Sequence, residues 1–329
     1  MTPAAPCTGV GLAIPFWLDR PDEEAVEIAI AADRAGLETV WVGEMHAFDA
    51  FALATAVGLQ TESIAVKIGP LATSVRGPVS IALGVASVAT LTGRPVDVAL
   101  GASSPMIVAG WHDRPWDNLA VRMRETATVL RGLLDGERTD FDGEHVRAHG
   151  FRLRRPQPQA SLTIAAFGPA MTRVAAQLAN EVVLNLVGTE TVARLRKTVA
   201  DEAAAAGREA PRLAVWVPAA LDPGPEALAQ LAGQLAVYLG APGYGEMFAE
   251  LGFGSLVERA RAGERRGELA AAIPRELLAS IGAIGSAEEV KARIAEYHDA
   301  GAEQVALVPS TAEDAGGERV LQAVAGSAA

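Results

Sequence analysis

The sequence predicts an α/β fold, a (β/α)8 TIM barrel with insertions at the C-terminal ends of its strands. Short apolar runs alternate along the chain with longer segments of helical periodicity. The runs are apolar throughout, as in strands that are covered on both faces. Parallel neighbours require helical crossovers, and eight such strand–helix units are the number that closes a barrel of this type.

The strands are expected, in chain order, at residues 10–16, 39–43, 64–69, 96–101, 162–166, 181–186, 213–217 and 305–308. The clearest helices are expected at residues 25–35, 50–60, 79–91, 119–134, 170–179 and 287–300. The first helix shows the basis of these assignments. An acidic turn at residues 22–24 favours its start, and Gly36 favours its end.

An open, doubly wound sheet is the competing architecture, and it predicts a phosphate-binding fingerprint after the first strand. Gly9 and Gly11 have the spacing of that fingerprint, but Ile14 stands where its third glycine belongs. The two glycines also open the strand instead of following it. The dinucleotide-binding signal is therefore absent, which favours the closed barrel.

The chain is expected to form a single domain over residues 1–329, with insertions near 136–158 and 222–285. The first insertion contains Asp142-Gly143, which is typical of a β-hairpin turn. The second contains aromatic residues between helical stretches. An insertion at the C-terminal end of a barrel strand usually shapes a binding pocket, although a plain helical connector explains the second one as well.

Composition excludes several classes of protein. The chain has 28 basic and 40 acidic residues and a net charge of −12, which argues against nucleic-acid binding. Its one cysteine excludes an intramolecular disulfide and a cysteine-based zinc cluster. We find no secretory signal and no apolar stretch of membrane-spanning length. A cytoplasmic protein with a small-molecule substrate is expected.

Barrel enzymes place their chemistry at the C-terminal ends of the strands. Here these ends are rich in glycine, small and aromatic residues, and the spacing of the histidines predicts no metal site. Glu44 is the one well-placed acid, whereas a glycosidase needs two. Residues 166–173 run from a strand into a helix N-terminus, where exposed amides and Arg173 favour a phosphate. An ordinary strand-to-helix turn explains this segment equally well.

Five segments, in order, resemble the bacterial luciferase-like superfamily. Residues 36–46 look like its second strand, and residues 68–73, followed by Gly77-Pro78, look like the end of its third. Residues 90–101 are similar to its next turn and strand, and residues 284–290 and 298–309 to its closing units. Residues 164–172 resemble the branch that uses the deazaflavin coenzyme F420, which includes methylene-tetrahydromethanopterin reductases. The resemblance covers nearly the whole chain except the two insertions.

The resemblance implies a barrel that binds F420 or FMN across the strand ends, and a homodimer. Family members often carry a non-proline cis peptide after the third strand, which by position is the Leu71–Ala72 bond. The residues expected at the cofactor are Met45, Gly69, Pro70, Leu71, Ala72, Thr73, Ser103, Ser104, Phe167, Gly168, Pro169, Ala170, Met171 and Arg173.

One residue departs from the family pattern. The family often has a proton-handling histidine where this chain has Met45, which offers an apolar contact and no proton. The candidates for the missing acid are His46 and His112, followed by Glu44. The aromatic residues that suggest an apolar or planar substrate are Trp17, Phe48, Trp111, Trp116 and Phe253.

Three functions follow from these observations. The first is an F420-dependent oxidoreductase that transfers a hydride between the deazaflavin and a small organic substrate. The second is an FMN-dependent monooxygenase with the same fold. The third is a protein that binds a flavin-like ligand without turnover, which the missing histidine suggests. Binding of F420 but not FMN favours the first, and tight binding without any reaction favours the third.

Overall fold

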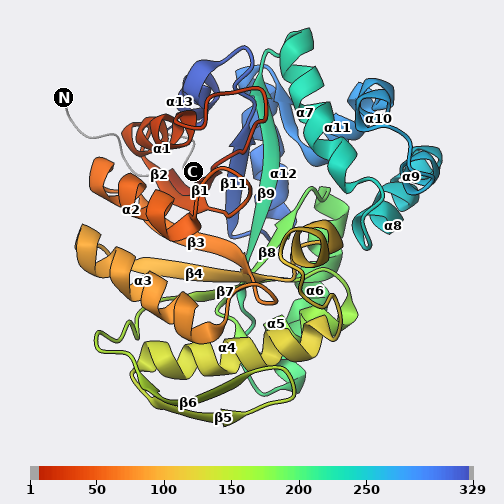
Figure 1. Ribbon diagram of the computed structural model, residues 1–329. Coiled ribbons are helices and arrows are strands. Elements are labelled where there is room, and N and C mark those ends of the chain that lie inside the picture. Colours follow the sequence, from red (N-terminus) through yellow and green to blue (C-terminus); the bar gives the residue numbers. More distant parts are fainter. Residues whose placement is uncertain (1–6, 326–329) are drawn as a thin grey trace. The chain divides into compact units, whose positions relative to one another are not determined.

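The computed structural model describes residues 7–325, which form two compact units (Figure 1). Unit 1 consists of the chain up to Glu38, Leu184–Arg194 and the chain from Val215 onward. Unit 2 consists of Thr39–Val183 and Leu195–Ala214. The expectation of a single domain stays a prediction.

The main sheet has the strand order β10-β9-β11-β1-β2-β3-β4-β7-β8, and β9 also pairs with β8. These pairings close eight parallel strands, separated by helices, into the (β/α)8 barrel that the sequence predicts. The strands are β1 (Cys7–Ala13), β2 (Leu37–Val42), β3 (Ala65–Ala72), β4 (Val96–Gly101), β7 (Leu162–Ala165), β8 (Glu181–Asn185), β9 (Arg212–Leu221) and β11 (Gln304–Pro309). The three-residue strand β10 (Ala283–Gly285) pairs with the end of β9.

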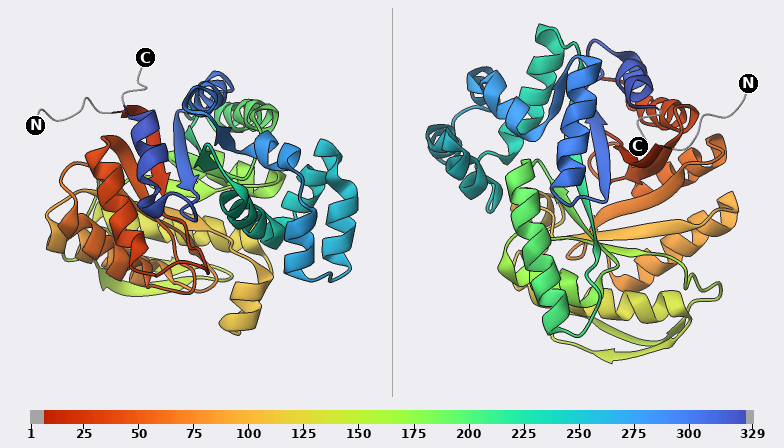
Figure 2. Two further views of the ribbon diagram at one scale, coloured as in Figure 1. Left: turned by 90° about the horizontal axis from the view of Figure 1, so that it is seen from above. Right: turned by 180° about the vertical axis from the view of Figure 1, so that it is seen from behind.

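In unit 2, helices follow the strands on the outside, as Figures 1 and 2 show. They are α2 (Ala50–Gln60), α3 (Pro78–Thr92), α4 (Leu119–Asp135) and α5 (Pro169–Leu178), with the π-helix η1 (Met106–Trp111) between β4 and α4. The expected hairpin is present as β5 (Arg138–Asp142) and β6 (Arg147–Arg152). Helix α6 (Thr189–Ala205) begins in unit 1 and ends in unit 2.

Unit 1 contains α1 (Glu24–Arg34), α12 (Ala287–Asp299), the short 3-10 helix η3 (Ala315–Gly317) and α13 (Glu318–Val324). The second insertion is helical. It comprises α7 (Pro225–Tyr238), α8 (Tyr244–Phe248), η2 (Ala249–Phe253), α9 (Gly254–Arg261), α10 (Arg266–Ala272) and α11 (Arg275–Ile281).

All eight expected strands are found, but the first is displaced. It was expected at residues 10–16 and lies at Cys7–Ala13, so it ends before Pro15. Proline lacks the amide that a ladder bond needs, which fits a strand that stops ahead of it. The sequence did not predict β10, because three residues are too few to show a strand pattern.

The core of unit 2 contains a buried ion pair. Lys67 Nζ on β3 lies 2.9 and 2.7 Å from the two carboxylate oxygens of Glu181 on β8. The same ammonium group stands over the Trp41 ring, 4.3 Å from its centroid. The charges of Lys67 and Glu181 therefore compensate each other, which offsets the cost of burying each of them in the apolar core.

No helix among residues 7–325 is both long and apolar enough to cross a bilayer. In the same part of the chain, no group of three or more His, Cys, Asp or Glu side chains is arranged to hold a metal ion.

Candidate functional site

The candidate site is built first from the ends of β2, β3 and β4, which are consecutive in the sheet of unit 2. Val42 is in register with Ile68, and Ala72 with Gly101. The segments that leave these strands therefore begin side by side. The C-terminal end of a barrel sheet is where such proteins carry ligand contacts.

Strand β3 ends in a bulge. Its register against β4 shifts between Ile68 and Leu71, and the Gly69–Pro70 peptide bond is cis. The expected cis bond at Leu71–Ala72 was wrong, because within residues 7–325 the cis bond precedes a proline, two residues earlier. Proline accepts the cis form far more readily than other residues do.

Close packing explains why glycine occupies the start of this bulge. Gly69 has φ +119°, and a Cβ on it would lie 2.3 Å from the carbonyl oxygen of Ala99. Only a residue without a side chain fits both conditions. The bulge is then tied to β4, because the amide of Thr73 donates to the carbonyl oxygen of Gly101 at 3.1 Å.

Two hydroxyl groups just after the bulge are buried without partners. Thr73 Oγ1 and Ser74 Oγ have no hydrogen-bond partner among the described residues. The Leu71 side chain is fully buried in the core, whereas Pro70 and Ala72 keep part of their surface exposed. Buried hydroxyls normally find a partner, so these two are suited to polar atoms of a ligand.

The end of β2 carries an acid that is already paired. Arg76 Nε donates to Glu44 Oε2 at 2.8 Å, and Arg76 Nη2 donates to Glu44 Oε1 and to Asp49. The hydrogen bond to Glu44 raises the pKa of Arg76, against the opposing effect of burial. Glu44 also accepts from the amide of Ala50 at 3.3 Å. The sequence analysis missed Arg76, although an acid at a strand end was a reason to look for a cation.

Asp49 completes this cluster as the N-cap of α2. Its carboxylate accepts from the amides of Phe51 and Ala52 at 2.9 and 3.0 Å. Burial works to raise the pKa of Asp49, but these amides and Arg76 outweigh it, and the pKa lies below its usual value. The cluster is thus a fixed structural element beside the bulge.

The turn from β7 to α5 has the backbone that a phosphate site needs. Gly168 has φ +90° and precedes Pro169 at the start of α5, and a Cβ on it would meet nothing within 4 Å. Its surface is open, and the free amides of the helix start lie next to it. Ala170 is exposed, Met171 is buried and Phe167 is half-buried. Arg173 Nε lies 3.3 Å from a Glu202 carboxylate oxygen, and its contact with a phosphate stays a prediction.

The remaining expected residues of unit 2 lie on exposed or half-exposed segments. Ser103 follows β4 with φ +66°, and Ser104 Oγ accepts weakly from the Ile107 amide at 3.4 Å. The side chains of Met45, His46, Trp111 and His112 are exposed, and those of Phe48 and Trp116 are half-buried. Among the described residues, no side-chain hydrogen bond holds either histidine.

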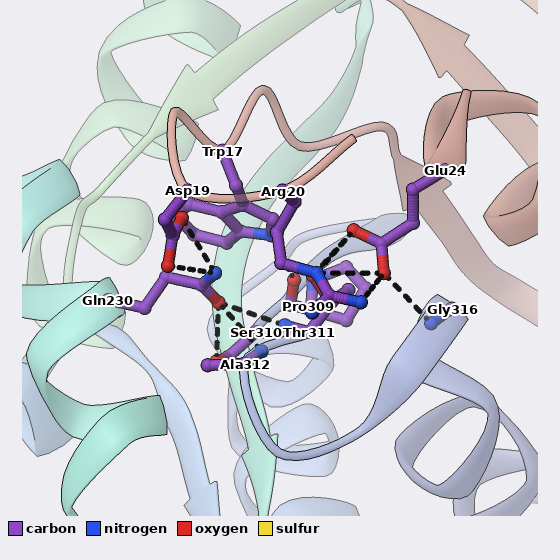
Figure 3. Close-up of polar contacts among 10 residues, drawn as sticks. All are labelled: Trp17, Asp19, Arg20, Glu24, Gln230, Pro309, Ser310, Thr311, Ala312 and Gly316. Atoms are coloured by element: carbon purple, nitrogen blue, oxygen red, sulfur yellow. Dashed lines mark hydrogen bonds and ion pairs between the residues drawn. The ribbon is translucent and has the colours of Figure 1, made fainter. Parts of the chain in front are cut away.

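Trp17 and Phe253 belong to unit 1. Trp17 is only 8 % exposed, and its Nε1 donates to the carbonyl oxygen of Pro309 at 3.1 Å (Figure 3). The indole is therefore largely buried, and its contact with a substrate stays a prediction. Phe253 is half-buried at the end of η2.

Unit 1 also contains a polar network that the sequence analysis did not anticipate (Figure 3). Gln230 Oε1 accepts from Ser310 Oγ at 2.7 Å and from the Thr311 amide at 2.9 Å, and its Nε2 donates to Asp19 at 3.1 Å. Thr311 Oγ1 in turn donates to Glu24 at 2.8 Å. These bonds fasten α7 to the segments that follow β1 and β11. They join residues up to 287 positions apart, so no local motif signals them.

A (β/α)8 barrel with glycine-rich turns and unpartnered hydroxyls at its strand ends is suited to bind a ligand at those ends. The chain belongs to the luciferase-like monooxygenase family, which it matches over residues 15–304. It is similar to a coenzyme F420-dependent oxidoreductase of Mycobacterium tuberculosis, with 24 % identity over 92 % of this chain and 96 % of that protein.

Solved structures with the same fold include proteins of both cofactor types. An F420-dependent secondary alcohol dehydrogenase aligns with a TM-score of 0.78 at 21 % identity, covering 96 % of this chain and 99 % of that one. The tetrahydromethanopterin reductase of Methanopyrus kandleri gives 0.80 at 18 %, covering 98 % and 99 %. An FMN complex of a Baeyer-Villiger monooxygenase constituent from Pseudomonas putida gives 0.69 at 17 %, covering 98 % of both chains.

Proposed function

We propose that this protein is an F420-dependent oxidoreductase, which transfers a hydride between the deazaflavin and a small organic substrate. The observation that carries the proposal is the set of strand ends in unit 2. Thr73 and Ser74, just after the β3 bulge, have buried, unpartnered hydroxyls, and the turn at Gly168 has an open backbone at a helix start. The F420-related relative over 92 % of the chain supports the choice of cofactor.

The residues present fit such a cofactor. Thr73 and Ser74 would donate to polar atoms at the edge of its ring, while Pro70 and Ala72 would contact its face. The backbone around Gly168, at the start of α5, would hold its phosphate, because a Cβ at this position would meet nothing within 4 Å. Pro169 has no amide N–H and would contribute only a contact. Met45 would add an apolar contact, and Ser103 and Ser104 would assist. When bound, F420 would accept or supply the hydride.

The proton that accompanies the hydride must come from another group. Glu44 is held by Arg76 through two hydrogen bonds, which leaves its carboxylate poorly placed to serve as the acid. His46 and His112 are exposed after β2 and β4 and are free to turn toward a substrate. Histidine exchanges protons near neutral pH without special tuning. We therefore place the acid function on one of these two residues.

An FMN-dependent monooxygenase is the second candidate. The family to which the chain belongs is the luciferase-like monooxygenases, and a monooxygenase constituent in complex with FMN has the same fold. Binding without turnover is a third candidate, because Met45 cannot exchange a proton.

We further propose a cytoplasmic homodimer. Helices α2 and α3 contain no charged residue, although 21 % of the chain is charged. Their outer sides expose Leu59, Leu83 and Leu91. Uncharged helices with exposed leucines favour burial against a second copy. Sedimentation velocity tests this directly, since a monomer at micromolar concentration would contradict it.

The activity is tested by mixing the protein with F420 and small secondary alcohols without oxygen and following the visible absorbance of the oxidised deazaflavin. Bleaching that requires both protein and alcohol is expected. The double variant Thr73→Val/Ser74→Ala should bind F420 more weakly, because each lost hydrogen bond is worth about 0.5–1.5 kcal/mol. Oxygen-dependent turnover with reduced FMN, and none with F420, would replace the proposal with the monooxygenase.

A further inference from the structure

The segment between β4 and α4 is built differently from the rest of unit 2. It contains the π-helix η1, which Figure 2 shows in gold as a short helix that projects from the unit. Val108 is its one buried residue. Met106 and Trp111 are 52 % and 48 % exposed, so this one short segment presents two large apolar side chains to water. Short π-helical turns occur frequently at functional sites.

Three residues of this segment have a strained backbone conformation. Ser103 has φ +66°, Asp113 has φ +50° and Asn118 has φ +46°, although none of them is glycine. They stand before η1, just after it and immediately before α4. Strained non-glycine residues cluster at ligand clamps and switch regions. A segment with such residues at both ends and little buried surface is suited to move as a unit.

The position of the segment relates it to the candidate site. It leaves β4 at Gly101, whose carbonyl oxygen accepts from the Thr73 amide of the β3 bulge. Arg76 bridges Glu44 and Asp49, so these three charges are paired with one another. The charged residues Asp113 and Arg114 come after the bend that follows η1. The part of the segment that starts beside the bulge is therefore uncharged.

We propose that the segment Ser103–Asn118 closes over the substrate, and that Met106 and Trp111 on this segment contact it. These two side chains favour uncharged, apolar substrates. This inference rests on the proposed function. Closure would remove both side chains from water, which is favourable only against an apolar surface. The unbranched thioether of methionine adapts to different shapes, so we expect tolerance of several apolar substrates.

The first test is oxidation of methionine by dilute peroxide, followed by peptide mass spectrometry, with F420 alone and with F420 plus cyclohexanone. Met106 is expected to be oxidised readily with F420 alone and several-fold more slowly once cyclohexanone is added. The buried Met123 and Met247 serve as internal references. This measurement needs no turnover, and equal oxidation of Met106 under both conditions would overturn the inference.

The second test compares kcat/KM for cyclohexanol and isopropanol, with lactate as a charged secondary alcohol. Met106→Ala and Trp111→Ala should each lower the ratio of cyclohexanol to isopropanol by about tenfold, as expected for lost apolar contacts. Val237→Ala, which truncates an exposed residue on α7, should leave it unchanged. Unchanged ratios in both variants, or a preference for lactate, would overturn the inference while F420 binding still stands. Failure to bind F420 would instead overturn the proposed function.

Discussion

Replacing Lys67 with methionine is expected to destabilise the barrel strongly. The side chains of Lys67 and Glu181 are 4 % and 3 % exposed, and the ammonium group touches both carboxylate oxygens. Methionine is close to lysine in volume, so little packing is lost. The carboxylate of Glu181 would remain buried without its cation, which costs about 3–5 kcal/mol.

The expected shift in melting temperature follows from the size of the chain. The unfolding entropy is about 2.1 cal/mol/K per residue. Over 329 residues, each kcal/mol of lost stability therefore lowers Tm by about 1.4 °C. The loss therefore predicts a decrease in Tm of about 4–7 °C, measurable by calorimetry. Removing both charges with Lys67→Met/Glu181→Leu should recover most of it, because no charge is then left unpaired.

An exposed ion pair on α6 provides the matched control. Lys197 Nζ lies 2.6 Å from Asp201, with side chains 78 % and 64 % exposed. Lys197→Met should cost less than about 0.5 kcal/mol. The reasoning would be refuted if Lys67→Met cost no more than this control, or if the double variant were less stable than the single one.

Three further variants test the site and the fold. Gly168→Val should weaken F420 binding, measured by fluorescence titration. Gly263→Val, at an equally open positive-φ glycine outside the site, should leave binding unchanged. Equal F420 affinities of the two variants would remove the β7–α5 turn from the site. At least one of His46→Ala and His112→Ala should lower kcat by about 10²-fold with F420 binding intact; wild-type turnover in both would exclude them as the acid. Burial works to raise the pKa of Glu24, but bonds from Arg20, Thr311 and the Gly316 amide hold it below its usual 4.5. Its contribution to stability is therefore present above that pH and lost as the pH falls through the folded pKa. Glu24→Gln should be less stable than wild type at neutral pH, and the difference should shrink in acid; a difference that does not change with pH would contradict this.

The barrel could be predicted because its strands are local features. Each apolar run, such as residues 39–43, predicts a strand that is covered on both faces. The helices between successive strands predict that neighbouring strands are parallel. The hairpin turn at Asp142-Gly143 was equally local. The position of the first strand was not predicted correctly, because Pro15 ends it early. Strand β10 was not predicted, because its three residues are too few to show a strand pattern.

The candidate site was harder to predict because its details depend on distant partners. Nothing in the sequence near Glu44 shows that Arg76, 32 residues away, holds its carboxylate. Nothing in the sequence near Trp17 shows that its indole donates to the carbonyl oxygen of Pro309, 292 residues away. The glycines of the expected cofactor segments were better guides to the local backbone. Gly69 and Gly168, one in each segment, both have a positive φ.

The most direct test of the proposed function is a fluorescence titration of the purified protein with F420 and, separately, with FMN. We predict saturable binding of F420, and at least tenfold weaker binding of FMN, a difference of about 1.4 kcal/mol. The Gly168→Val variant, included in the same titration, should bind F420 more weakly. Tight binding of FMN with no binding of F420 would contradict the proposed function.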